Sequence, residues 1–113
     1  MPTRRLKSGA ARSAPIFAAL GDETRLRLVA RLCAEAPVSI SGLTAGSDIS
    51  RQAVTKHLEV LARAGLVRGT RLGRERLYEL ETRRIDEARQ YLDAISTEWD
   101  DALSRLKRLV EGG

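Results

Sequence analysis

Apolar residues recur at alternating spacings of three and four along the last third of the chain. This pattern begins after a plausible N-cap at Thr82 and runs to about Val110. It predicts one long helix with a continuous apolar stripe, and a helix cannot leave such a stripe in water. We therefore expect residues 82–110 to pair with another helix, most simply that of a second copy. The stripe, here called the heptad stripe, consists of Ile85, Ala88, Leu92, Ile95, Trp99, Ala102, Leu106 and Leu109.

The chain has 113 residues, which is enough for one compact domain and too few for two. No apolar run approaches the roughly 20 residues that span a bilayer, and no apolar core of a secretory signal is present. The only cysteine, Cys33, excludes an internal disulfide and fits a reducing compartment. We therefore expect a cytoplasmic protein that has no membrane partner.

The formal net charge of +5 predicts a polyanionic partner. The excess is concentrated in two places. Residues 51–76 carry seven Lys and Arg against two Glu. Residues 1–13 hold basic residues and no acid, and we expect them to form a mobile arm or a frayed helix start, either merely solvated or following DNA phosphates. The basic residues of this arm are Arg4, Arg5, Lys7 and Arg12.

The middle of the chain contains signals for several short helices. Ser13 and Pro15 predict the start of a helix that ends at Gly21, and Asp22 predicts the N-cap of the next one. That second helix should bury an apolar stripe and end before Pro37. Residues 39–46 predict a short helix and residues 50–64 a longer one. A helix, a tight turn with a glycine and a second helix are typical of a helix-turn-helix. The second helix's expected stripe is Leu26, Val29, Ala30, Leu32 and Cys33.

The helix predicted at residues 50–64 buries Val54, Leu58 and Leu61 and ends at Gly65. Two β-prone runs follow, at residues 66–71 and 76–80, and Gly73 lies in the turn between them. The expected fold class is thus mainly α with a small β-hairpin wing, a winged helix-turn-helix. Residues 14–113 form this domain, and residues 82–110 form its dimerisation helix.

Catalytic and metal sites are not expected. His57 is the only histidine, and a lone helical histidine has neither a nucleophile nor an orienting group. Zinc sites need converging ligands, whereas Cys33 and His57 each stand alone, and Cys33 is interpreted as a small core thiol. No glycine-rich phosphate loop is present. We therefore expect no enzyme activity and no cofactor.

DNA binding remains, because a helix that follows a tight turn presents its first residues to base edges in the major groove. Arg suits guanine and Gln suits adenine, whereas Ser, Thr and Lys serve bases or phosphates. Arginines beside the hairpin turn would hold phosphates or the minor groove. The predicted DNA-binding residues are Ser50, Arg51, Gln52, Thr55, Lys56, His57, Arg71, Arg74 and Arg76.

Three stretches, at residues 17–29 (FAALGDETRLRLV), 50–67 (SRQAVTKHLEVLARAGLV) and 73–78 (GRERLY), resemble the ArsR-type winged-helix repressors of bacteria. The resemblance covers roughly residues 15–110. It implies a homodimer formed by the first and last helices, a palindromic operator, and repression that an effector usually relieves. The interface residues that it and the heptad stripe predict are Phe17, Ile85, Leu92, Ile95, Trp99 and Leu106.

The sequence departs from the family at its metal sites. Many members sense metals through a Cys-x-Cys pair in the first helix of the helix-turn-helix, or through His and acidic residues of the last helix. Residues 39–48 contain no cysteine and residues 82–113 no histidine. We therefore expect a regulator that does not respond to metals. Two alternatives stay open: a thiol-based redox sensor using Cys33, and a protein-interaction module whose stripe binds another partner.

Overall fold

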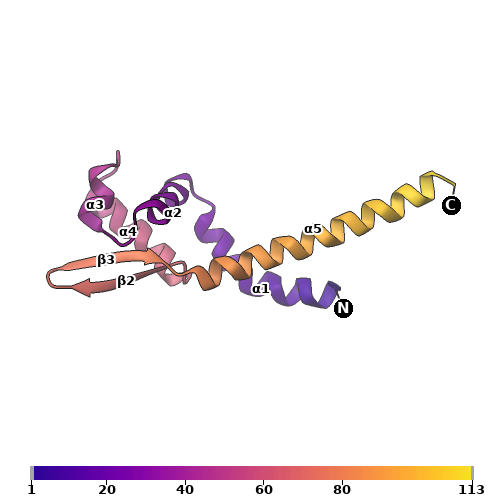
Figure 1. Ribbon diagram of the computed structural model, residues 1–113, viewed down its shortest axis with the longest axis horizontal. Coiled ribbons are helices and arrows are strands. Elements are labelled where there is room, and N and C mark those ends of the chain that lie inside the picture. The colour runs from indigo at the N-terminus through magenta and orange to yellow at the C-terminus, as the bar shows by residue number, and fades with distance from the viewer. Residues whose placement is uncertain (1, 113) are drawn as a thin grey trace.

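The computed structural model describes residues 2–112, with their side chains from residue 9 onward. A small lobe holds the middle of the chain, and a long helix projects from it with the first helix alongside (Figure 1). The mainly α fold with a β-hairpin wing is confirmed. The elements are α1 (Pro2–Leu20), α2 (Glu23–Glu35), β1 (Val38–Ser39), α3 (Ile40–Ala45), α4 (Arg51–Arg63), β2 (Val67–Leu72), β3 (Glu75–Leu80) and α5 (Thr82–Val110).

Side-chain caps fix where the lobe helices begin. The Asp22 carboxylate accepts a hydrogen bond from the Arg25 backbone N–H at 3.0 Å, as predicted. Ser39 caps α3 and Ser50 caps α4 in the same way, with oxygen–nitrogen distances of 3.0 and 3.1 Å. Each cap satisfies a backbone donor that has no partner inside the helix. Local chemistry thus sets the register with which each helix meets the core.

The core of the lobe lies where α2, α3 and α4 meet. The predicted inward stripe of α4 is confirmed, since Val54, Leu58 and Leu61 are at most 1% exposed. Leu32 of α2 and Leu43 of α3 pack in the same buried cluster. Because one stripe of α4 fills this core, the opposite face of that helix must point outward.

The structure corrects the expected stripe of α2. Leu28 and Leu32 are buried, whereas Leu26 is 51% exposed and Cys33 is exposed. Leucines occur on both faces of this helix, so the spacing allowed two possible stripes. The stripe that packs in the core contains Leu28 and Leu32, which are four residues apart. The interpretation of Cys33 as a buried core thiol is therefore wrong.

Two predicted helix starts also differ. Helix α1 already begins at Pro2, so residues 2–13 continue the helix, and Ser13 lies inside it with 2% exposure. Ser13 is thus a packed helix residue, not an N-cap. The N-cap of α5 is Glu81 rather than Thr82, and it makes no side-chain cap hydrogen bond.

The three-stranded sheet has the order β1-β3-β2, and both pairings are antiparallel. The predicted hairpin is confirmed, with Leu72 opposite Glu75 and a two-residue turn at Gly73 and Arg74. Gly73 has φ of +63°, and no residue other than glycine has positive φ among those described, which fits a type II′ turn. Strand β1 was not predicted, because its two residues are too few to show alternation.

Helix α1 runs antiparallel to the first half of α5 (Figure 1). Tyr91 of α5 packs near Phe17 of α1, with ring centroids 6.2 Å apart. A Cβ placed on Gly9 would lie only 2.6 Å from the Tyr91 ring, so glycine permits the close approach. Of the heptad stripe, Ala88 is buried and Ile85 packs against the core. The residues beyond Leu92 stay exposed.

The positive-φ glycines give a stability test. Gly65→Ala should lower the free energy of unfolding by about 1–2 kcal/mol or more, because Gly65 has φ of +79° and the added Cβ would lie 3.1 Å from Arg84 Cγ. Gly73→Ala is the matched comparison. Gly73 also has a positive φ, at +63°, but nothing lies within 4 Å of its added Cβ, so its loss of stability should reflect backbone strain alone. Urea denaturation measures both. A Gly65→Ala protein as stable as the parent would contradict the assigned helix end.

Candidate nucleic-acid interface

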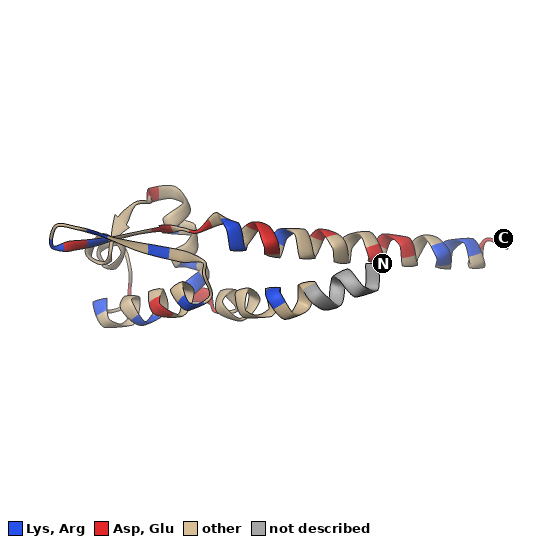
Figure 2. Ribbon diagram, turned by 90° about the horizontal axis from the view of Figure 1, so that it is seen from below, with Lys and Arg blue, Asp and Glu red and all other residues tan. Residues whose placement is uncertain are grey.

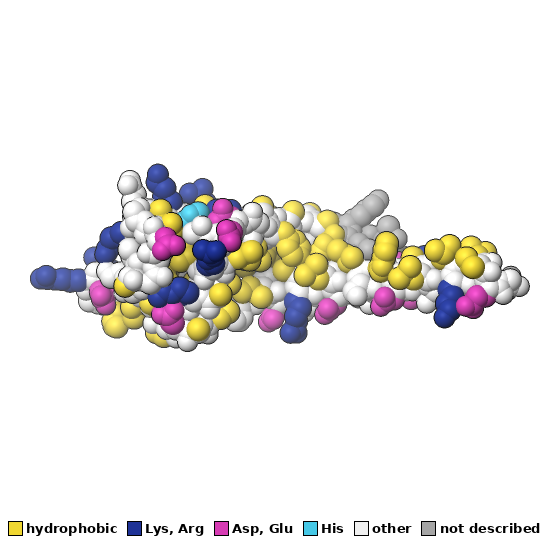
Figure 3. All heavy atoms as spheres, turned by 90° about the horizontal axis from the view of Figure 1, so that it is seen from above, with side chains coloured by type: hydrophobic (Ala, Val, Ile, Leu, Met, Phe, Trp, Pro, Cys, Tyr) yellow, Lys and Arg dark blue, Asp and Glu magenta, His cyan; other side chains and the backbone are white. Residues whose placement is uncertain are grey.

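The first two turns of α4 carry polar side chains on the face opposite the core. Gln52 and Lys56 are exposed there, about 160° around the helix from Val54. Basic side chains project from the lobe in the space-filling view, whereas apolar ones follow the long helix (Figure 3). The structure therefore brings Gln52 and Lys56 together on a free face, with Thr55 at its edge.

Arg51 and Thr55 lie on the side of α4 that faces α3. Arg51 Nη1 donates to Ser41 Oγ over 2.7 Å, and Thr55 Oγ1 donates to the Arg51 carbonyl over 2.9 Å. The Thr55 hydroxyl therefore keeps only acceptor capacity for a ligand. Ser41 was not among the predicted site residues. Ser41 could have been predicted from topology, because consecutive helices of a helix-turn-helix lie side by side.

The structure places His57 apart from the free face. Its ring is half-buried, and Nδ1 lies 3.4 Å from Nη1 of Arg25 in α2. Five positions separate His57 from Gln52, which puts them about 140° apart around the helix. His57 thus adjoins α2, whereas Gln52 and Lys56 point away from the lobe.

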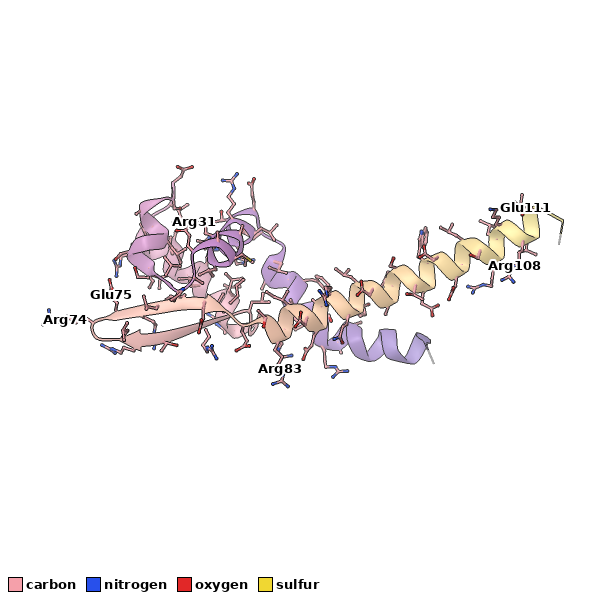
Figure 4. The ribbon with its side chains drawn as sticks, in the orientation of Figure 1. Arg31, Arg74, Glu75, Arg83, Arg108 and Glu111 are labelled. Atoms are coloured by element: carbon pink, nitrogen blue, oxygen red, sulfur yellow. The ribbon has the colours of Figure 1, made fainter. Side chains whose placement is uncertain are left out.

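The wing carries the remaining predicted arginines, all exposed. Arg71 and Arg76 lie directly opposite each other in the antiparallel register and share one face of the hairpin. Arg74 points outward from the hairpin tip (Figure 4). A Cβ on Gly69 would lie 3.0 Å from Arg76 Cδ, so this glycine makes room for the Arg76 side chain.

The charges of the wing divide by face. On the opposite face, Arg68 pairs with Glu79 at 2.7 Å and Glu81 at 3.6 Å, and the Glu79 hydrogen bond raises the pKa of Arg68. Among residues 9–112, no ion pair within 4.0 Å engages the three wing arginines that the sequence singled out. Lys and Arg lie on the hairpin and the lobe helices with Asp and Glu among them (Figure 2). The free positive charge of the wing therefore lies at its tip and on one face.

Arg31 of α2 holds α3 in place. Its guanidinium donates to both carboxylate oxygens of Glu35 over 2.8 and 3.0 Å, which lowers the pKa of Glu35. It also donates to the carbonyls of Gly42, at 3.1 Å, and Leu43. These contacts satisfy carbonyls of α3 and fix its position beside α4. The sequence did not predict the role of Arg31, because it donates to backbone carbonyls, which every residue type carries.

Neither a metal-binding cluster nor a membrane-spanning helix occurs in the described part of the chain. Residues 2–112 contain no cluster of three or more His, Cys, Asp or Glu able to hold a metal ion. None of the helices there is long and apolar enough to cross a membrane.

Known proteins resemble the chain over most of its length. A family model for helix-turn-helix domains matches residues 20–70. The HTH-type transcriptional regulator Rv2034 of Mycobacterium tuberculosis is 36% identical over 93 residues, which are 82% of this chain and 83% of that protein.

Solved structures of transcriptional regulators have a similar fold. The ArsR-like transcriptional regulator from Rhodococcus sp. RHA1 has a TM-score of 0.80 and 37% identity, covering 91% of this chain and 96% of that one. A second structure, an ArsR family transcriptional regulator, has a TM-score of 0.71 and 27% identity, covering 80% and 92%.

Opposed arginines on the wing predict an effect on stability. Arg71→Thr should raise the free energy of unfolding of the DNA-free protein by about 0.2–1 kcal/mol, since like charges directly across a strand pair are destabilising. Arg68→Thr, the control on the other face, should lower it by removing the pairs with Glu79 and Glu81. Thermal melts at low salt measure both, and added salt should shrink both changes. A destabilised Arg71→Thr protein would show that the pair is not repulsive.

Proposed function

The chain belongs to the ArsR-type family of winged helix-turn-helix transcriptional regulators, and we propose that it is a homodimeric repressor that binds a palindromic operator without sensing metals. The observation that carries this proposal is the outward polar face at the start of α4, which the lobe core holds in place. The proteins it resembles are DNA-binding regulators, so the chain is not an enzyme. We further propose that it acts in the cytoplasm.

In this proposal the start of α4 enters the major groove. Gln52, Thr55 and Lys56 read base edges, with Gln52 suited to the donor and acceptor pair of adenine. Ser50 and Arg51 hold phosphates, and Ser41 supports Arg51 through the 2.7 Å hydrogen bond. The exposure of Gln52 and Lys56 supports their assignment.

The wing arginines then meet the DNA backbone or the minor groove beside the α4 site. Arg74 extends from the tip, and Arg71 and Arg76 share one face (Figure 4). Their lack of carboxylate partners within the described residues supports this role, because phosphates would supply the missing negative charge.

Dimerisation is supported by the exposed part of the heptad stripe. Leu92, Trp99 and Leu106 are 51%, 65% and 56% exposed, although their spacing is that of a helix–helix seam. A continuous apolar strip along a projecting helix marks an interaction surface. We assign it to a second copy, with Phe17 of α1 at its edge and Ile85 and Ile95 in the seam, so that two α4 helices reach successive major grooves.

Membership of the family supports the proposed repression, and the missing metal ligands support the proposed lack of metal sensing. Helix α3 contains no cysteine and α5 no histidine. Stoichiometric Zn²⁺ or As(III) binding that weakens the DNA complex would refute this part of the proposal. Selection of bound DNA from a random pool tests the rest, since a recovered palindrome would give both the operator and the half-site spacing.

One observation favours a second candidate, a redox-sensing regulator. Cys33 is exposed at the end of α2 rather than packed in the core, so oxidants and a second thiol can reach it. Loss of DNA binding in mild oxidant, absent in Cys33→Ser, would support this candidate. By contrast, membership of the family favours DNA regulation over a protein-interaction module.

Base reading and phosphate contact should separate in mutants. Gln52→Ala should cost roughly 1–3 kcal/mol at one operator base pair and relax specificity there. Arg74→Ala should weaken all sequences alike and reduce the salt slope by about 1. Fluorescence anisotropy with the selected operator and its single-base variants measures both effects, and Gln90→Ala on α5 serves as the surface control. An unchanged operator preference in Gln52→Ala would show that the base-reading assignment is wrong.

The dimer can be tested on opposite faces of α5. Trp99→Glu should give a monomer in light scattering at micromolar concentration and weaken palindrome binding by about a hundredfold, because linked half-sites no longer act together. Thr97→Glu is the matched control, since it adds the same charge about 160° away around the helix. A wild-type monomer would remove both the dimer and the palindrome from the proposal.

A further inference from the structure

One side chain, that of Arg25, connects the end of α1 to α4. Its Nε donates to the Ala19 carbonyl over 2.6 Å, and Nη2 lies 3.5 Å from the Ala18 carbonyl oxygen. On its other side, Nη1 lies 3.4 Å from His57 Nδ1. The backbone N–H of the same residue donates to Asp22, the cap of α2. Arg25 therefore joins the end of α1 to α4, the helix that carries Gln52 and Lys56.

A hydrogen bond from Arg25 to His57 requires a neutral imidazole ring. A guanidinium has only donors, so Nδ1 must accept and the ring proton must lie on Nε2. Imidazole gains a second proton between about pH 8 and pH 5. Protonation would turn Nδ1 into a donor and place two positive charges side by side.

The other groups near the ring keep their charge across that range. Asp22 is the nearby carboxylate of α2, and its pKa is lowered, first by the hydrogen bond from the Arg25 N–H, then by the charge of Arg25 and, when the ring is protonated, by that of His57. The only groups of α1 to which the Arg25 side chain donates are the uncharged carbonyls of Ala18 and Ala19. Within the described residues, no carboxylate oxygen lies within 4.0 Å of the imidazole nitrogens. Within the described residues, the Arg25–His57 contact therefore has no carboxylate directly beside the ring.

We propose that Arg25 is a positioning residue that couples α1 to the DNA-reading helix α4 through neutral His57, and that protonating His57 loosens α4. This rests on the proposed function, in which α4 reads DNA. The core side chains Leu58 and Leu61 still hold α4, so the change is in its orientation and not in its folding. His57 thereby has a different role from the direct DNA contact that the sequence predicted for it.

The experiment uses the full chain, in which His57 is the only histidine. NMR of the ring gives its titration midpoint, and anisotropy with the selected operator gives DNA affinity between pH 8.0 and 5.5 at constant ionic strength. We expect affinity to fall by about tenfold over the same midpoint, the scale of a hydrogen bond to a charged group. His57→Asn should show a flat profile near the neutral-pH affinity, because its amide oxygen accepts from Arg25 at any pH. His57→Lys should bind weakly throughout.

Other outcomes overturn the proposal. If His57 contacted phosphates directly, acid would strengthen binding and His57→Lys would bind more tightly. A flat wild-type profile would show that the contact carries no coupling. Loss of folded signal by circular dichroism at pH 5.5 would assign His57 to stability alone. A wild-type protein without sequence-specific binding at pH 8.0 would instead refute the proposed function.

Discussion

The shared core of α2, α3 and α4 is the constraint on which the rest of the lobe depends. Three short helices, none of them stable alone, bury side chains such as Leu32, Leu43 and Leu58 that are at most 1% exposed. The stripe of α4 has to face this core, so the rotation of α4 about its axis is fixed, and its polar face is directed outward. The core therefore decides which residues of α4 face outward.

A second constraint lies outside the lobe, on the apolar stripe of α5. The first turns of α5 pack on α1 and the core, where Ala88 is 5% exposed, but the later apolar residues have no such cover among the described residues. The first turns of α5 therefore belong to the domain core, whereas the rest of α5 projects from it. Under the proposed function, α5 of a second copy covers these apolar residues. The spacing of the two α4 helices then follows from how the two α5 helices pair.

The sequence predicted best where one local rule decides. The caps at Asp22 and Ser50, the stripe of α4 and the turn at Gly73 all follow from spacing and residue type, and all are present. It failed where tertiary packing chooses between local options. Helix α2 carries leucines on two faces and only the core decides between them, so Leu28 replaced Leu26 and Cys33 came out exposed. Ser13 looked like a cap because nothing local shows that α1 continues along α5.

The basic residues show why net charge was a poor guide to the site. Arg31 holds α3 carbonyls, Arg25 holds the end of α1, and Arg68 is paired with two glutamates, so these three stabilise the fold. The wing arginines carry the same charge without such partners in the described structure. Composition counts both groups alike, and only hydrogen-bond geometry separates them. The excess charge drew attention to residues 51–76, but the division between structural and free cations within that segment required the register of β2 and β3.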